Sequence, residues 1–125
     1  MATTHEAVQI SAIVPTLTVD DLQKSITFYE ALGFTIDFDA GEVAGLSCDS
    51  GAFLLQNYHQ EDWAGNFMMQ LVVEDLDAWW AHIEALDLPG RFGVPAPRPP
   101  AVQPWGLTVA YVVGPSGELW HIVQK

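Results

Sequence analysis

The chain contains one phrase of sequence twice, and this repeat constrains the fold more than any other feature. Residues 19–34 read VDDLQKSITFYEALGF, and residues 73–88 read VEDLDAWWAHIEALDL. Six residues of the first copy recur at an offset of 54 positions, namely Val19, Asp21, Leu22, Glu30, Ala31 and Leu32. Two copies of one unit predict two similar modules, with any binding site between them.

Each copy is expected to form an amphipathic helix that follows a strand. Residues 10–19, ISAIVPTLTV, and residues 67–73, FMMQLVV, have the β-branched or apolar composition of strands. Asp20 or Asp21 is expected to cap the first helix, and Gly33 to end it. The two predicted buried stripes share one spacing and consist of Leu22, Ile26, Tyr29 and Leu32, then Leu76, Trp80, Ile83 and Leu86.

Short strands are expected to complete both modules, at 34–39, 42–48, 52–58, 107–113 and 118–124. The proline-rich residues 89–106 predict an extended connection rather than a helix. The order β-α-β-β-β, repeated, predicts an α+β fold in one domain of residues 1–125. Module one spans about 8–60 and module two about 66–125. Helices on one face of each sheet leave the other faces free to form a curved mixed sheet around a cleft.

Charge and composition exclude several classes of partner. A net charge of −12 repels nucleic-acid phosphates and anionic membranes, so neither is expected as a partner. No apolar run approaches the roughly 20 residues of a membrane span, and the N-terminus lacks a signal-peptide pattern, so a soluble cytoplasmic protein is expected. Cys48 is the only cysteine and is expected to be structural.

The repeat and the C-terminal segment together resemble the vicinal oxygen chelate superfamily. This superfamily includes glyoxalase I, extradiol dioxygenases, fosfomycin-resistance enzymes and bleomycin-resistance proteins. The resemblance rests on VDDLQKSITFYEALGF, VEDLDAWWAHIEAL and the closing segment PWGLTVAYVVGPSGELWHIVQ, in that order and spacing. It implies two βαβββ modules with paired curved sheets.

The resemblance also implies four places where metal-dependent members carry His, Gln or Glu. By spacing they fall on Val14, Met68, Leu55 and His121, with Leu54 or Gln56 as alternatives to Leu55. Three of the four therefore lack an oxygen or nitrogen donor, and one histidine cannot hold a divalent ion. No metal and no cofactor are expected. The chain is in this respect similar to the bleomycin-resistance proteins, which are acidic, aromatic-rich drug sequesterers.

Alternation along the strands predicts a cleft lined by apolar residues with a few polar anchors. The predicted ligand-binding residues are Val14, Thr16, Leu55, Asn57, Met68, Gln70 and His121, with Trp63 in the linker and Trp105 at the rim. Phe53 and Leu119 are expected on the same inner face.

The leading hypothesis is a metal-independent binder that sequesters an aromatic compound, cationic or neutral, such as an antibiotic. The alternative is an enzyme, a lyase, isomerase or hydrolase, that uses His121 as its acid or base. A third reading is a dimeric interaction domain with a vestigial pocket. Bare sheet edges favour a homodimer, in which the cleft includes residues of both chains.

Overall fold

The computed structural model describes residues 9, 11–58 and 67–125. The first module comprises β1 (Thr16–Val19), α1 (Leu22–Leu32), β2 (Thr35–Asp39), β3 (Val43–Cys48) and β4 (Gly51–Asn57). The second comprises β5 (Met68–Val73), α3 (Leu76–Leu86), α4 (Leu88–Phe92), β6 (Arg98–Val102), β7 (Thr108–Val113) and β8 (Leu119–Gln124). No helix among these described segments is long and apolar enough to cross a membrane.

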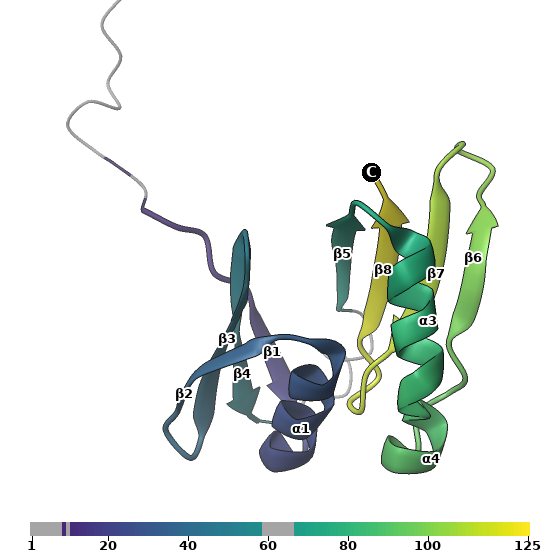
Figure 1. The fold of residues 1–125 in the computed structure, drawn as a ribbon. Coiled ribbons are helices and arrows are strands. Elements are labelled where there is room, and N and C mark those ends of the chain that lie inside the picture. The colour runs from purple at the N-terminus through teal and green to yellow at the C-terminus, as the bar shows by residue number, and fades with distance from the viewer. Residues whose placement is uncertain (1–8, 10, 59–66) are drawn as a thin grey trace, which may run out of the picture.

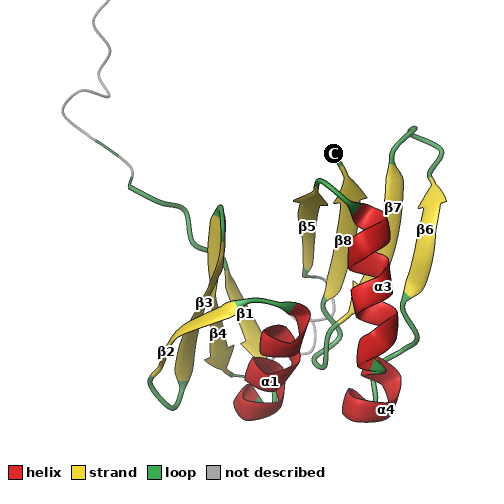
Figure 2. Cartoon of the chain, in the orientation of Figure 1, coloured by secondary structure: helices red, strands yellow, loops and turns green. Residues whose placement is uncertain are grey.

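Each module forms its own four-stranded mixed sheet with its helices on one face (Figures 1 and 2). The strand orders are β1-β4-β3-β2 and β5-β8-β7-β6. The first strand of each module lies at an edge and pairs in parallel with the last strand, while the other pairs are antiparallel. The α+β fold of two βαβββ modules is thereby confirmed.

The repeated sequence produces the same helix ends in both modules. Asp21 accepts a hydrogen bond from the Lys24 amide at 3.1 Å, and Asp75 accepts one from the Ala78 amide at 3.0 Å. The residues after the helices have positive φ, 121° at Gly33 and 50° at Asp87. The cap at Asp21, one of the two aspartates expected to cap this helix, therefore recurs at the equivalent position of the second copy.

The second module departs from the expected extended connection at one point. Asp87 caps a further short helix, α4, by accepting a hydrogen bond from the Gly90 amide at 3.3 Å. The prediction of extended chain at the start of 89–106 is therefore wrong, because Pro89 occupies the first turn of a helix, where its missing N–H costs nothing. Strand β6 begins only at Arg98.

The helix-covered faces of the two sheets meet in one shared core. Tyr29, Phe34 and Phe53 of module one surround Trp120 of module two, with ring centroids 5.4 to 5.8 Å from the indole. These rings belong to a single cluster of buried residues that draws on both modules. Because the covered faces meet each other, the free faces of the two sheets point away from this core, on the outside of the chain.

A buried polar network also joins the modules. The Tyr29 hydroxyl donates to Glu118 Oε2 at 2.5 Å and accepts from Trp120 Nε1 at 2.8 Å. The other carboxylate oxygen of Glu118 accepts from the Ser116 amide at 2.8 Å. A second link runs between the helices, where His82 Nε2 lies 3.1 Å from the carbonyl oxygen of Ala31 at the end of α1. His82 is exposed and makes this contact between the modules.

Candidate functional site

A row of polar side chains crosses the free face of the second sheet. The pairing register places Gln70 opposite His121, His121 opposite Tyr111, and Tyr111 opposite Arg98. Directly paired residues share a face, so these four side chains lie on one line across β5, β8, β7 and β6. Trp120 and Ile122, the neighbours of His121 along β8, belong to the core and fix the opposite orientation for His121.

Apolar residues flank this polar row on both sides. One flanking row contains Met68, Leu119 and Val113, and the other contains Val72, Val123, Val109 and Ala101. Met68, the first residue of the edge strand β5, is 64% exposed and Val72 on the same strand is 60% exposed, whereas Val109 and Val123 are only 1% and 4% exposed. The free face thus combines exposed apolar side chains on β5 with a polar row through its centre, the composition of a small-molecule site.

The polar row is organised by contacts among its own members. The Tyr111 and His121 rings meet edge to face with centroids 4.9 Å apart. The Tyr111 hydroxyl donates to Gln103 Oε1 at 3.1 Å, and Gln103 Nε2 donates to the Ala101 carbonyl at 3.0 Å. The imidazole is therefore held by a ring that is itself oriented, and its nitrogens can donate or accept hydrogen bonds towards a ligand.

The free face of the first sheet carries short polar side chains and one aromatic ring. The register aligns Thr16, Leu54, Gly45 and Phe38 across β1, β4, β3 and β2. A Cβ atom at Gly45 would lie 2.3 Å from Phe38 Cε1, so the glycine is required for this ring to lie flat on the sheet. Thr18 lies on the same face, and its buried hydroxyl has no hydrogen-bond partner among the described residues.

The structure distributes the predicted site residues unevenly. Met68, Gln70 and His121 share the free face of the second sheet, and Thr16 lies on that of the first. Val14 is exposed just before β1. Asn57 ends β4, where its side chain donates to Glu42 at 3.4 Å. Trp105 is 60% exposed in the turn after β6, and Trp63 lies outside the described residues.

The expected placement of Leu55 and Phe53 on the inner face is wrong. Leu55 is 0% exposed and belongs to the core, paired with Leu17 and Ala44. Phe53 packs on Tyr29 beneath α1. The prediction counted four residues from Gly51 to Leu55 and was off by one position. A shift of one residue moves every side chain of a strand to the opposite face. Leu54 and Gln56, the alternatives, occupy the free face.

Tyr111 and Arg98 were missed by the sequence reasoning. Alternation along residues 107–113 indicates which residues share a face with Tyr111. The hairpin register, which pairs Tyr111 with His121, was needed to show that this is the free face. Arg98 had no usable signal, since β6 is irregular and its register shifts between Arg98 and Ala101.

The four positions that carry metal ligands in metal-dependent members of the vicinal oxygen chelate superfamily do not hold a suitable set of ligands in this chain. Val14 and Met68 offer aliphatic or thioether groups, and so does Leu54 on the free face of β4. His121 offers a good donor and Gln56, the other alternative on that face, offers an amide oxygen, so at most two of the places supply a donor. Across residues 9, 11–58 and 67–125 no cluster of three His, Cys, Asp or Glu side chains is placed to hold an ion.

The comparisons with known proteins agree with this fold. The family model of the Glyoxalase/Bleomycin resistance protein/Dioxygenase superfamily matches residues 9–122. A bleomycin resistance protein of Klebsiella pneumoniae is 30% identical over 116 residues, which cover 89% of this chain and 90% of that protein.

Solved structures give the same result. A bleomycin-binding protein complexed with bleomycin has a TM-score of 0.77 at 25% identity, covering 93% of this chain and 99% of the other. The bleomycin-binding protein of bleomycin-producing Streptomyces verticillus, complexed with copper(II)-bleomycin, has a TM-score of 0.72 at 26% identity, covering 94% and 98%. With its two βαβββ modules and a family match over nearly its whole length, the chain belongs to the Glyoxalase/Bleomycin resistance protein/Dioxygenase superfamily.

Proposed function

We propose that this protein binds and sequesters an aromatic, cationic antibiotic of the bleomycin type without a protein-bound metal. The observation that carries the proposal is the free face of the second sheet, where Gln70, His121 and Tyr111 form a polar row beside the exposed apolar side chains of Met68 and Val72. Such a surface can stack a flat ligand and orient it by a few hydrogen bonds. The relatives that bind bleomycin support this ligand class.

The electrostatics favour a cationic ligand. The chain carries 16 Asp and Glu against 4 Lys and Arg, so its long-range field attracts positive charge. Sequestration requires affinity and enough protein but no bond making. The proposal therefore needs no catalytic group.

The site is completed by a second copy of the chain in this proposal. The free faces point outward in a single chain, and β1 and β5 are edge strands with one unpaired side each among the described strands. Unpaired edges favour strand-to-strand association. A homodimer that joins β1 of one chain to β5 of its partner would bring the free face of a first sheet opposite that of a second sheet. A cleft would then form between the two chains.

The experiment is a titration of chelator-treated protein with metal-free bleomycin, followed by tryptophan fluorescence and mass spectrometry of the recovered ligand. Saturable binding of an unchanged ligand at one molecule per site supports the proposal. Light scattering on the same sample should give twice the mass of one chain. A monomer that binds nothing would overturn the proposal.

The second candidate is an enzyme that uses His121 as acid or base. It is favoured by the position of His121, half-buried on the free face and held by Tyr111. Recovery of a chemically altered ligand, lost in His121→Ala, would replace sequestration by catalysis.

A further inference from the structure

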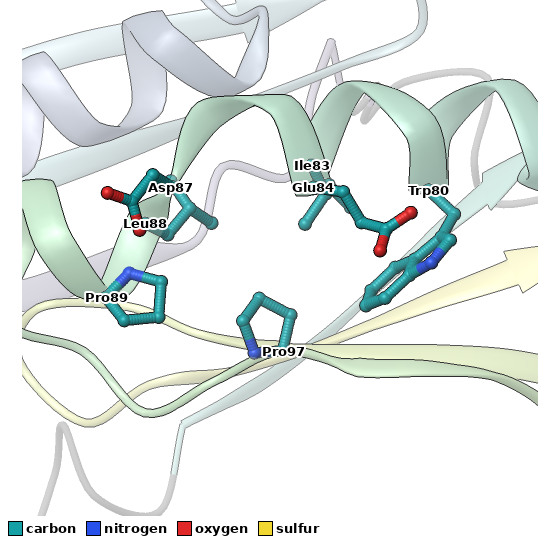
Figure 3. A pocket seen from close by; sticks show the side chains of 7 residues that line it. All are labelled: Trp80, Ile83, Glu84, Asp87, Leu88, Pro89 and Pro97. Carbon is teal, nitrogen blue, oxygen red and sulfur yellow. The ribbon is translucent and has the colours of Figure 1, made fainter.

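A cavity on the opposite side of the second sheet has the features of a separate cation site. It has a volume of about 220 Å³ and lies between α3, α4 and the chain that leads into β6. Its lining residues are Trp80, Ile83, Glu84, Asp87, Leu88, Pro89 and Pro97 (Figure 3). Pro97 lines this cavity on the helix side, while Arg98, the next residue, pairs with Tyr111 in the row across the free face. The sheet therefore separates the two sites.

One carboxylate and one indole face the same space in this cavity. Trp80 and Glu84 are four residues apart on α3 and so share a helix face. Figure 3 shows the carboxylate of Glu84 directed towards Trp80, while that of Asp87 points away from it. Asp87 is already used as the cap of α4. An aromatic face beside an unused carboxylate attracts a cation by both quadrupole and charge.

No positive side chain of the described structure neutralises Glu84. The one ion pair in the described part of the chain joins Lys125 to Glu74. The Arg91 guanidinium lies 5.1 Å from the centre of the Phe92 ring. Asp77, three residues before Trp80 on the same helix face, adds to the negative field.

The remaining walls select the type of cation. Ile83 and Leu88 are buried beneath the cavity, and the rings of Pro89 and Pro97 close its other side. These groups offer apolar surface and few hydrogen-bond acceptors. A primary ammonium would lose its hydration there without replacement, whereas a methylated ammonium carries its charge on an apolar surface. We propose that this cavity is a binding site for a small methylated ammonium group, held by Trp80 and Glu84.

The repeat supplies matched control variants. Glu84 is equivalent to Glu30 of α1, and Trp80 is equivalent to Ile26. Glu30→Gln removes the same charge at the same place of the other helix, where it lines neither cavity described along α3. Trp80→Ile installs the residue that α1 carries at that position. Trp79→Leu alters the neighbouring tryptophan, which lines a different cavity with Ala78 and His82.

The experiment is a titration of the full chain with tetramethylammonium chloride at constant ionic strength, balanced with sodium chloride. The readout is the tryptophan indole N–H signals in two-dimensional NMR, with Trp80 assigned from Trp80→Ile. We expect a saturable shift of the Trp80 signal with a dissociation constant on the order of 1 mM, since so small a ligand binds weakly. Glu84→Gln should weaken this binding about tenfold, and Glu30→Gln and Trp79→Leu should leave it unchanged.

Three results would overturn the proposal. The first is equal weakening by Glu84→Gln and Glu30→Gln, which would indicate a bulk charge effect. The second is an equal shift with neopentyl alcohol, a neutral molecule of similar shape. The third is the lack of any shift of the Trp80 signal up to about 100 mM tetramethylammonium, because a site that does not bind at this concentration has negligible affinity. Because the site lies on the other side of the sheet, none of these results bears on antibiotic binding at the free face.

Discussion

The hydroxyl of Tyr29 on α1 donates a hydrogen bond of 2.5 Å to the carboxylate of Glu118, which immediately precedes the last strand of the other module. Both side chains are 0% exposed. The bond therefore lies inside the shared core and ties the first helix to the β7–β8 turn. A hydrogen bond to a buried charged group is among the stronger ones in a protein.

Replacing Tyr29 by Phe should destabilise the chain without changing its packing volume. The variant removes the donor to Glu118 and the acceptor for Trp120 Nε1, so two buried polar groups lose a partner. We expect a loss of about 3 kcal/mol in the free energy of unfolding by urea. Phe28→Tyr at the neighbouring buried position tests overpacking instead. A Tyr29→Phe variant as stable as the parent would show that the network contributes nothing.

The stability of the protein should depend on pH through Glu118. Burial is the main cause that raises the pKa of this carboxyl above its ordinary value, and the hydrogen bonds from Tyr29 and Ser116 oppose the rise in part. Because the folded state binds the Glu118 proton more tightly than the unfolded state, proton binding at Glu118 stabilises the fold. This contribution to the free energy of unfolding is complete below the unfolded pKa, near 4.5, and is lost as pH rises through the folded pKa.

Glu118→Gln should therefore flatten the stability profile in this window. Gln also places an amide donor against the Tyr29 hydroxyl or the Ser116 amide, which lowers stability equally at every pH. The diagnostic quantity is the slope of the unfolding free energy against pH above about pH 4.5, not the free energy itself. An unchanged slope in Glu118→Gln would assign the pH dependence to other groups. Asp20→Asn, which removes the nearby charge that also raises the Glu118 pKa, should reduce the slope only slightly.

Gly114→Ala should damage the same network from the opposite side. A Cβ atom at Gly114 would lie 2.3 Å from the Glu118 carboxylate carbon, and the carboxylate is fixed by its hydrogen bonds. We expect a loss of about 2 kcal/mol, measured as a lowered midpoint of thermal unfolding. Gly51→Ala is the matched control, because its new Cβ would meet Cys48 Sγ at an ordinary 3.8 Å. Equal effects at both glycines would contradict the steric argument.

His121→Ala should weaken ligand binding and leave the fold intact. The imidazole lies half-buried on the free face and is not part of the apolar core. We expect about a tenfold rise in the dissociation constant for metal-free bleomycin, measured by fluorescence titration. His82→Ala is the control, since His82 joins α3 to the end of α1. His82→Ala should lower the midpoint of thermal unfolding and leave the dissociation constant for bleomycin unchanged. If His82→Ala weakened binding and His121→Ala did not, the free face would be excluded as the binding surface.

The repeat was sufficient to predict the two modules, and local rules explain why. An aspartate cap, an apolar stripe and a residue with positive φ act within one helix, so their effects can be read from neighbouring positions. The caps at Asp21 and Asp75 and the helix end at Gly33 follow these rules. Alternation along β8 likewise predicted that His121 lies on the free face, because its neighbour Trp120 points to the other face.

Other features depended on contacts between segments far apart in sequence. Which face Leu55 covers is decided by its pairing with Leu17 and Ala44, and a strand shifted by one residue would satisfy its local pattern equally well. Trp80 has the same stripe spacing as buried Ile26 but lines an open cavity, because α4 and Pro97 leave space beside it.

The sequence by itself determined α1 and α3, the cap and end of α1, and the order of the strands other than β6, because these depend on interactions along one stretch of chain. The short helix α4 and strand β6 were not predicted. Only the tertiary structure decided that Glu118 meets Tyr29 across 89 positions, that the helix-covered faces share a core, and that the free faces point outward. The physical reason is that non-local packing minimises exposed apolar area over the whole chain, and no single segment encodes which partner it will bury against.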